Sequence, residues 1–159
     1  MTTPDYKSIA SKLDFEGRAF IDGKYVDAID GGKFETINPA TGEVLCSVAK
    51  CNSKDVDLAV KVSRKAFNSG IWSRTSPEFR KDVLLKFAEL LRKHGVENSV
   101  LESVDTGKLI GDCINEVAND APMHFQWYGE LIDKVFGKIG STDPSITSLI
   151  VKEPIGVVA

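Results

Sequence analysis

The side chains of this sequence that could do chemistry are a few carboxylates, cysteines and histidines. Glu116 and Asp120 lie four residues apart in a helical pattern, so they are expected to share one helix face. Such a pair could carry out acid–base chemistry or bind a cationic ligand, but it is more often a solvated face, which is the favoured interpretation. His124 stands between Met123 and Phe125, a setting typical of a packed or half-exposed histidine.

The spacing of the cysteines favours free thiols over a metal site or a nucleophile. Cys46, Cys51 and Cys113 are odd in number and include no C-x-x-C spacing, which favours reduced thiols. A metal-binding or catalytic cysteine is the alternative, but the only histidines are His94 and His124, and no H-x-x-x-H pair completes a zinc site. No serine, cysteine or histidine has the neighbours of a nucleophilic triad.

The turn Asp105-Thr106-Gly107-Lys108 is a candidate phosphate-binding loop. It has a single glycine and lacks the G-x-x-x-x-G-K-[ST] pattern, so the end of a helix is the favoured interpretation. No G-x-G-x-x-G occurs in the chain, and the complete dinucleotide-binding fingerprint is therefore absent.

Composition and charge exclude several classes of function. The chain has 159 residues, of which 42% are apolar and 27% charged, with a formal net charge of -3. That charge disfavours nucleic acid and anionic membranes as partners. No apolar run approaches the roughly 20 residues of a membrane span. The first residues lack the basic and apolar regions of a signal peptide, which predicts a cytoplasmic location.

The first fifty residues are predicted to form β-structure after a polar tail. Residues 1–17 could be a loose tail or a short docked helix. Asp22-Gly23 between two β-rich runs predicts a tight hairpin, because a type I′ turn needs positive φ at both positions. Further turns precede a strand over Val44 to Ala49. Together these strands predict an antiparallel meander.

Four helices should follow, because the apolar period then changes from two to about 3.6. They begin at Ser53, at Ser76 with Pro77, near Val96, and at about Asp112. The last is predicted to run to Phe136, with a kink near residues 118–122 because Pro122 removes a main-chain donor.

The carboxyl-terminal stretch predicts two strands. Ile146 to Lys152 is rich in β-branched residues, and Ile155 to Ala159 has the composition of a buried parallel strand. The fold class is therefore α/β.

From Phe20 to Ala159, the sequence resembles the amino-terminal third of the NAD(P)-dependent aldehyde dehydrogenase superfamily. Six segments in the family's order carry the resemblance: F-I-D-G-K-Y-V at Phe20, I-N-P-A-T-G-E-V at Ile37, D-V-D-L-A-V at Asp55, L-E-S-V-D-T-G-K at Leu101, W-Y-G-E-L-I-D-K-V-F-G at Trp127 and V-K-E-P-I-G-V-V at Val151.

The resemblance implies a domain organisation. Residues 1–17 would be a tail, 18–140 the amino-terminal part of the coenzyme-binding domain, 141–153 an oligomerisation-arm strand and 154–159 the start of a Rossmann-like sheet. The full-length enzyme would oxidise an aldehyde to a carboxylic acid with NAD or NADP through a cysteine thiohemiacetal. Its catalytic cysteine, general-base glutamate and oxyanion asparagine are expected downstream. This chain would therefore contain no catalytic or coenzyme-binding residue, bind no coenzyme tightly and be inactive by itself.

The resemblance also suggests three sites in the chain. The backbone around Thr36 and Ile37 and the side chain of Asp105 would contribute to a monovalent-cation site. Glu116 and Asp120 would lie at the substrate entrance, as in members that oxidise aminoaldehydes. The strand from Ile146 to Val151 would join a second copy in a homo-oligomer.

Two other interpretations stay open. A stand-alone oligomerisation or regulatory module could dock onto full-length subunits. An unrelated α/β binding domain would require the ordered match to be accidental.

Overall fold

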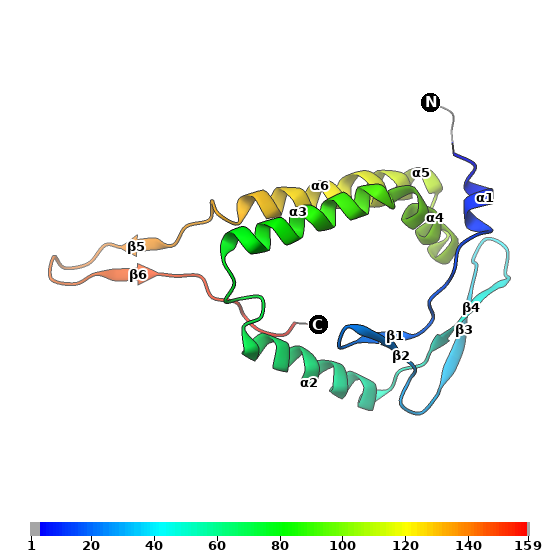
Figure 1. The fold of residues 1–159 in the computed structure, drawn as a ribbon, viewed down its shortest axis with the longest axis horizontal. Coiled ribbons are helices and arrows are strands. Elements are labelled where there is room, and N and C mark those ends of the chain that lie inside the picture. The colour runs from blue at the N-terminus through cyan, green and yellow to red at the C-terminus, as the bar shows by residue number, and fades with distance from the viewer. Residues whose placement is uncertain (1–3, 159) are drawn as a thin grey trace.

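The computed structural model describes residues 4–158 as an open arrangement of helices and small two-stranded sheets (Figure 1). The elements in chain order are α1 (Tyr6–Ala10), β1 (Ala19–Ile21), β2 (Lys24–Val26), β3 (Lys33–Ile37), β4 (Val44–Ala49), α2 (Ser53–Ser69), α3 (Pro77–Lys93), α4 (Gly95–Thr106), α5 (Ile110–Cys113), the π-helix η1 (Ile114–Asp120), α6 (Ala121–Leu131), β5 (Lys138–Gly140) and β6 (Ser148–Ile150). The chain is thus mixed α/β, as predicted.

The first predicted hairpin is confirmed. Ala19 pairs with Val26, and the turn residues Asp22 and Gly23 have φ values of 56° and 76°. Asparagine, aspartate and glycine tolerate this left-handed region best, so the Asp-Gly pair determines the turn.

The predicted continuous meander is wrong. The antiparallel pairs β1–β2 and β3–β4 form separate sheets, because the connection between them is bound to helix α2 instead. The Ile29 N–H donates to Asp55 Oδ1 at 2.8 Å, and the Asn52 N–H donates to Asp55 Oδ2 at 2.8 Å. Asp55 is only 2% exposed, so its carboxylate clamps the loop to the start of α2.

Capping residues account for the starts of the helices. Asn52, rather than Ser53, caps α2 and accepts from the Lys54 N–H at 2.8 Å. Ser76 caps α3 as predicted, accepting from the Phe79 N–H at 3.2 Å, with Pro77 at the first helical position.

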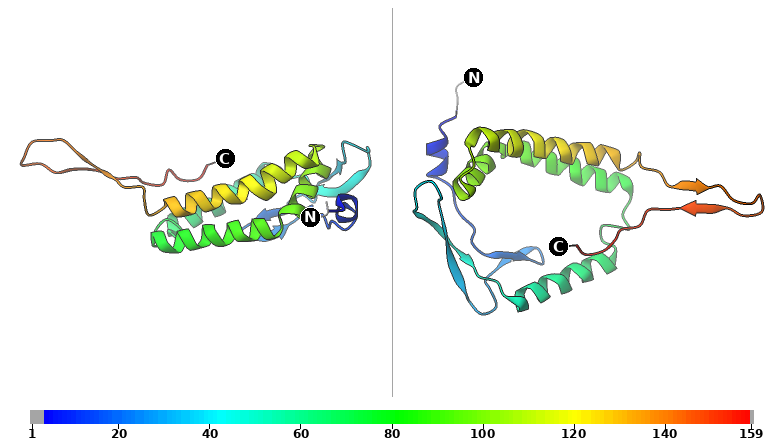
Figure 2. Two further views of the ribbon diagram at one scale, coloured as in Figure 1. Left: turned by 90° about the horizontal axis from the view of Figure 1, so that it is seen from above. Right: turned by 180° about the vertical axis from the view of Figure 1, so that it is seen from behind.

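Helices α3 and α6 lie antiparallel and side by side (Figures 1 and 2). Phe87 and Phe125 meet edge to face, with ring centroids 4.7 Å apart. Gly129 faces Leu84 closely: a Cβ at Gly129 would lie 3.1 Å from Leu84 Cβ. This pair is the main helix–helix contact of the chain.

The fourth helix contains a π-helix just before Pro122. The Ala121 N–H donates to the Glu116 carbonyl, five residues back, which is the π-helical spacing. The ribbon continues through these residues without a sharp bend (Figure 1). Wider turns therefore replace the predicted kink, because they accommodate a residue that has no N–H to donate. The α-helix then ends at Leu131, short of Phe136.

The segment after the helices forms a projecting hairpin. Strand β6 lies within the predicted strand and pairs antiparallel with β5, with Ile139 opposite Leu149. Figure 2 shows this hairpin extending away from the helices.

The predicted buried strand at Ile155 to Ala159 is not formed. Residues 151–158 contain no strand, Ile155 is 91% exposed and Val158 is 77% exposed. Ala159 lies outside the described residues. A buried strand needs partner strands and covered faces, and the described part of the chain gives it neither.

Few apolar side chains are buried in the part of the chain that the structure describes. They are Ala28, Ala88, Val100, Cys113 and Pro122. Large apolar side chains such as Trp127 and Phe136 are 64% and 78% exposed. Within residues 4–158, no helix is long and apolar enough to span a membrane.

The close contact between α4 and η1 is expected to depend on the missing side chain of Gly95. A Cβ at Gly95 would lie 2.8 Å from Ala118 Cβ and 2.9 Å from its Cα, so Gly95→Ala must push the helices apart. We expect Gly95→Ala to lower the free energy of unfolding by about 1–3 kcal/mol in urea titrations followed by circular dichroism. Gly111→Ala is the control, because no atom lies within 4 Å of the added Cβ. Equal midpoints for the two variants would contradict this packing.

A second prediction concerns the hydrogen bonds that the Asp55 carboxylate accepts from Ile29 and Asn52. Asp55→Ala removes the acceptor of two main-chain N–H groups and should lower the free energy of unfolding by about 2–4 kcal/mol. It should also speed amide exchange at Ile29, measured by NMR. Asp57→Ala removes an exposed carboxylate of the same helix and should change neither. Unchanged exchange at Ile29 in Asp55→Ala would show that the clamp is not formed.

Candidate functional site

Strand β3 and the end of helix α4 bring Thr36 and Asp105 together. The Thr36 hydroxyl donates to Asp105 Oδ1 at 3.2 Å, across 69 residues of sequence. The strand register shifts between Thr36 and Ile37, which marks a bulge at this point. Ile37 follows the bulge and pairs with Val44. The structure thus brings Thr36 and Asp105 together, and Ile37 is the chain neighbour of Thr36.

A groove of about 480 Å³ opens beside this contact. Its lining comes from the segment before β1, from the β3–β4 sheet and from α4: Asp14, Phe15, Glu16, Phe34, Thr36, Cys46, Val48, Leu101 and Asp105. Three carboxylates and a hydroxyl give it the oxygen-rich character that hard cations prefer. Thr36 and Asp105 therefore fit the donor chemistry of a monovalent-cation site.

One of these carboxylates is compensated by a neighbouring arginine. Arg18 Nε lies 2.8 Å from Glu16 Oε1, and Arg18 Nη2 lies 2.5 Å from Oε2. These hydrogen bonds lower the pKa of Glu16 to about 2 and raise the pKa of Arg18. Uncompensated negative charge in the groove therefore comes from Asp14 and Asp105.

Glu116 and Asp120 both lie in η1 but have different surroundings. The Glu116 carboxylate forms an ion pair with Lys108, whereas Asp120 makes its contact through its main-chain carbonyl, 2.7 Å from His124 Nδ1. Both side chains are exposed. Both carboxylates thus lie on one π-helix, and one of them is paired with a cation.

The turn at Lys108 is a helix end, as favoured from sequence. Gly107 caps α4 with φ of 76°, and the Lys108 carbonyl accepts from Ser103 Oγ at 2.7 Å. The hydrogen bond to Glu116 raises the pKa of Lys108. Sequence reasoning missed this partner, because helical periodicity does not predict contacts across a loop.

The cysteines form no disulfide within residues 4–158, and Cys113 is buried. Burial raises the pKa of the Cys113 thiol, so the protonated form predominates at neutral pH and is a poor nucleophile. No group of three or more His, Cys, Asp or Glu side chains in the described part of the chain is arranged to hold a metal ion.

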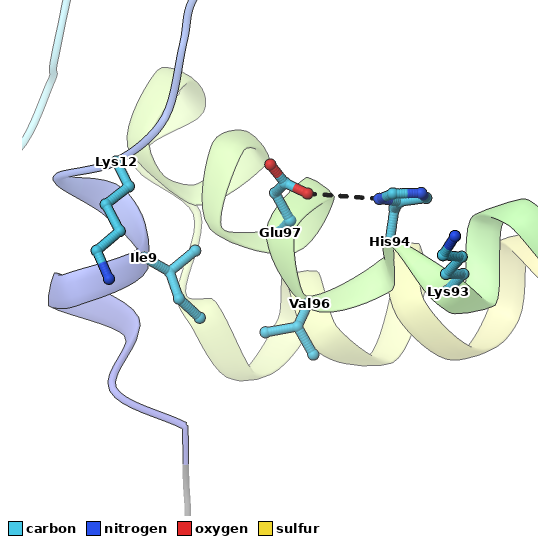
Figure 3. Close-up of a pocket in the computed structure, with 6 residues that line it drawn as sticks. All are labelled: Ile9, Lys12, Lys93, His94, Val96 and Glu97. Atoms are coloured by element: carbon cyan, nitrogen blue, oxygen red, sulfur yellow. Dashed lines mark hydrogen bonds and ion pairs between the residues drawn. The ribbon is translucent and has the colours of Figure 1, made fainter.

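Further grooves lie along the helices. Met123, His124, Trp127 and Tyr128 line one of about 290 Å³ on α6. Another, of about 360 Å³, separates helix α1 from the junction of α3 and α4 (Figure 3). In Figure 3, Ile9 of α1 faces Val96, and Lys12 follows the helix at the edge of the groove. His94 Nδ1 and Glu97 Oε2 form a pair 3.5 Å apart on the other side. The tail thus contains a docked helix, one of the two predicted alternatives.

Comparison with known proteins identifies the family. The profile of the aldehyde dehydrogenase family matches residues 25–159. The chain belongs to this family. It is 42% identical over 158 residues to the aminoacetaldehyde dehydrogenase of Pseudomonas aeruginosa, covering 99% of this chain and 32% of that enzyme. It is 40% identical over 150 residues to the NADP/NAD-dependent aldehyde dehydrogenase PuuC of Escherichia coli, covering 94% of this chain and 30% of that enzyme.

Solved aldehyde dehydrogenase structures contain the same fold. The enzyme KauB from P. aeruginosa superposes with a TM-score of 0.91 at 38% identity, over 96% of this chain and 31% of KauB. The indole-3-acetaldehyde dehydrogenase AldA of P. syringae, solved as a mutant with NAD+ and IAA, gives a TM-score of 0.90 at 38% identity, over the same 96% and 31%. The chain spans about a third of the length of these relatives, so it corresponds to a part of the aldehyde dehydrogenase fold.

The contact between Thr36 and Asp105 can be tested in the chain itself. Thr36→Val removes the hydroxyl but keeps the β-branched shape, and should lower the free energy of unfolding by about 0.5–1 kcal/mol. Thr36→Ser keeps the donor and should lose less than Thr36→Val in the same chemical denaturation. If both variants lost the same free energy, the hydroxyl would have no role in joining β3 to α4.

Proposed function

We propose that this chain is the amino-terminal part of an aldehyde dehydrogenase whose full-length form oxidises an aldehyde to a carboxylic acid. The observation that carries the proposal is the 42% identity across 99% of this chain to a stretch covering only 32% of a longer enzyme. The chemistry would proceed through a cysteine thiohemiacetal, with NAD or NADP accepting the hydride when bound. The catalytic cysteine, glutamate and oxyanion asparagine would belong to the rest of that enzyme.

The chain's own contribution would be structural and would shape the substrate entrance. Helix η1 presents Glu116 and Asp120, and acidic side chains favour a cationic substrate by charge complementarity. The aminoacetaldehyde dehydrogenase named among the relatives suggests the same class. We therefore propose an amine-bearing aldehyde as the substrate of the full-length enzyme.

The bulge at Thr36 and Ile37, together with Asp105, would support a monovalent cation. The Thr36 hydroxyl and Asp105 carboxylate supply two oxygen ligands 3.2 Å apart. Such a cation would join β3 to α4, a structural role, and no step of the reaction would depend on it.

The β5–β6 hairpin would serve in assembly. Strand β6 pairs with β5 along one edge only, in a sheet of two strands. Its second edge, within the segment Ile146 to Val151, could receive a strand from a second copy of the enzyme. Leu149 and Val151 are each 66% exposed and would be covered in such a homo-oligomer.

The exposed apolar surface supports one other candidate function. A stand-alone module that docks onto full-length subunits would also cover Trp127 and Phe136, which are 64% and 78% exposed. Mixing the isolated chain with the full-length P. aeruginosa enzyme distinguishes the candidates. A module should change that enzyme's sedimentation, whereas a segment that works only in cis should not.

A chimeric enzyme tests the proposed function. Residues 1–158 of this chain would replace the matching part of the P. aeruginosa aminoacetaldehyde dehydrogenase, and NAD+ reduction would be measured with aminoacetaldehyde. We expect turnover within about tenfold of the parent enzyme, because the folds superpose closely. The isolated chain should show no turnover. A folded chimera without activity, or turnover by the isolated chain, would contradict the proposal.

A further inference from the structure

The ion pair between Lys108 and Glu116 joins a loop to the π-helix. Lys108 stands in the connection between α4 and α5, and its ammonium group meets the Glu116 carboxylate eight residues later. The Lys108 side chain is 32% exposed and that of Glu116 is 58% exposed. Isolated surface pairs of this kind hold weakly unless the partners are already positioned.

The main chain of Lys108 is held in place from several sides. Its carbonyl accepts from Ser103 Oγ at 2.7 Å and lies 3.9 Å from Cys113 Sγ, while its N–H donates to Thr106 Oγ1 at 3.3 Å. Cys113 is in turn buried, and its carbonyl accepts from Ser99 Oγ at 3.1 Å. Because these contacts fix the main chain, pairing with Glu116 has to order only the side chain of Lys108 and not the loop as well.

Other charges around Lys108 do not replace Glu116. The charge of Glu102 on α4 also raises the pKa of Lys108, but less than Glu116 does, because Glu116 makes the hydrogen bond. Asp112 lies on α5, and its charge raises the pKa of Cys113. Glu116 is therefore the carboxylate that Lys108 compensates.

Asp120 lies on the same π-helix and forms no ion pair within residues 4–158. Its main-chain carbonyl lies 2.7 Å from His124 Nδ1. Next to it, Met123, His124, Trp127 and Tyr128 line the groove of about 290 Å³ on α6. The helix face therefore presents one compensated and one uncompensated carboxylate, and π-helical segments are frequent at functional sites.

We propose that Lys108 is a positioning residue that sets the charge of the substrate entrance by pairing with Glu116, which leaves Asp120 as the carboxylate that selects an amine-bearing aldehyde. This inference rests on the proposed function. Lys108 touches no reacting group. It acts through Glu116, and its removal would give the helix face a second unpaired negative charge.

The pair is tested first in residues 1–159 by NMR titration of the lysine ammonium groups. Glu116→Gln should lower the pKa of Lys108, because the carboxylate that raises it is lost. Asp133→Asn is the matched control, since Asp133 pairs with Lys134 at 2.7 Å and its removal changes the net charge equally. An unchanged Lys108 pKa in Glu116→Gln would overturn the proposal.

Selectivity is tested in the chimeric enzyme with two aldehydes of nearly equal size, aminoacetaldehyde and uncharged propanal. Lys108→Gln should lower KM for aminoacetaldehyde by about 2–5-fold at low ionic strength without changing kcat, and should leave propanal unaffected. The effect should fade in high salt and disappear in the double variant Lys108→Gln/Glu116→Gln. Asp120→Asn should raise KM for aminoacetaldehyde only.

The outcomes separate this inference from the proposed function. A chimera inactive towards both aldehydes counts against the proposed function, while the titration still decides whether the pair exists. An active chimera in which Lys108→Gln changes KM for both aldehydes equally shows a structural role only, and overturns the charge-setting role of Lys108.

Discussion

Amphipathic helices and hairpins must cover their apolar side chains, and within residues 4–158 this chain meets that requirement mainly where α3, α4, η1 and α6 pack together. There, Phe87 meets Phe125 and Gly95 allows the close approach of Ala118. Elsewhere the apolar faces are open: Val56 and Val60 of α2 are exposed, as are Ile139 of β5 and Trp127 of α6. Exposed apolar surface of this kind usually marks a site of contact with another protein or another part of the same protein. The same constraint explains why Ile155 to Val158, which belong to the predicted buried strand, pair with no other strand in the described part of the chain.

The packed helices also position the candidate site. Ser99 ties α4 to α5 by donating to the carbonyls of Gly95 and Cys113, at 2.7 and 3.1 Å. The end of α4 then places Asp105 against β3, and the following loop places Lys108 against η1. The contact of Asp105 with β3 and the ion pair of Lys108 with η1 thus both depend on how the end of α4 is positioned. The arrangement suits a part of an enzyme that shapes an entrance while the reacting groups are supplied by other residues.

Local chemistry was predictable from sequence, whereas long-range contacts were not. The Asp22-Gly23 turn, the Ser76 cap and the Gly107 helix end follow from the φ values and hydrogen bonds that these residues favour. The meander failed because the buried carboxylate of Asp55 binds the main chain of Ile29, a contact across 26 residues. The π-helix escaped prediction because a proline indicates a distortion without specifying its form. Strand β5 is only three residues long and has too little pattern to recognise. The proximity of Thr36 and Asp105 was expected from the family resemblance, since no spacing rule connects them, and Lys108 was overlooked as a partner of Glu116 for the same reason.

The intact mass of the protein isolated from its native source tests most directly whether this chain is one part of a longer enzyme. Because the chain covers 32% and 30% of its relatives, a polypeptide about three times its length is expected to contain this sequence. A native polypeptide with the 17.3 kDa mass of the chain itself would contradict that conclusion.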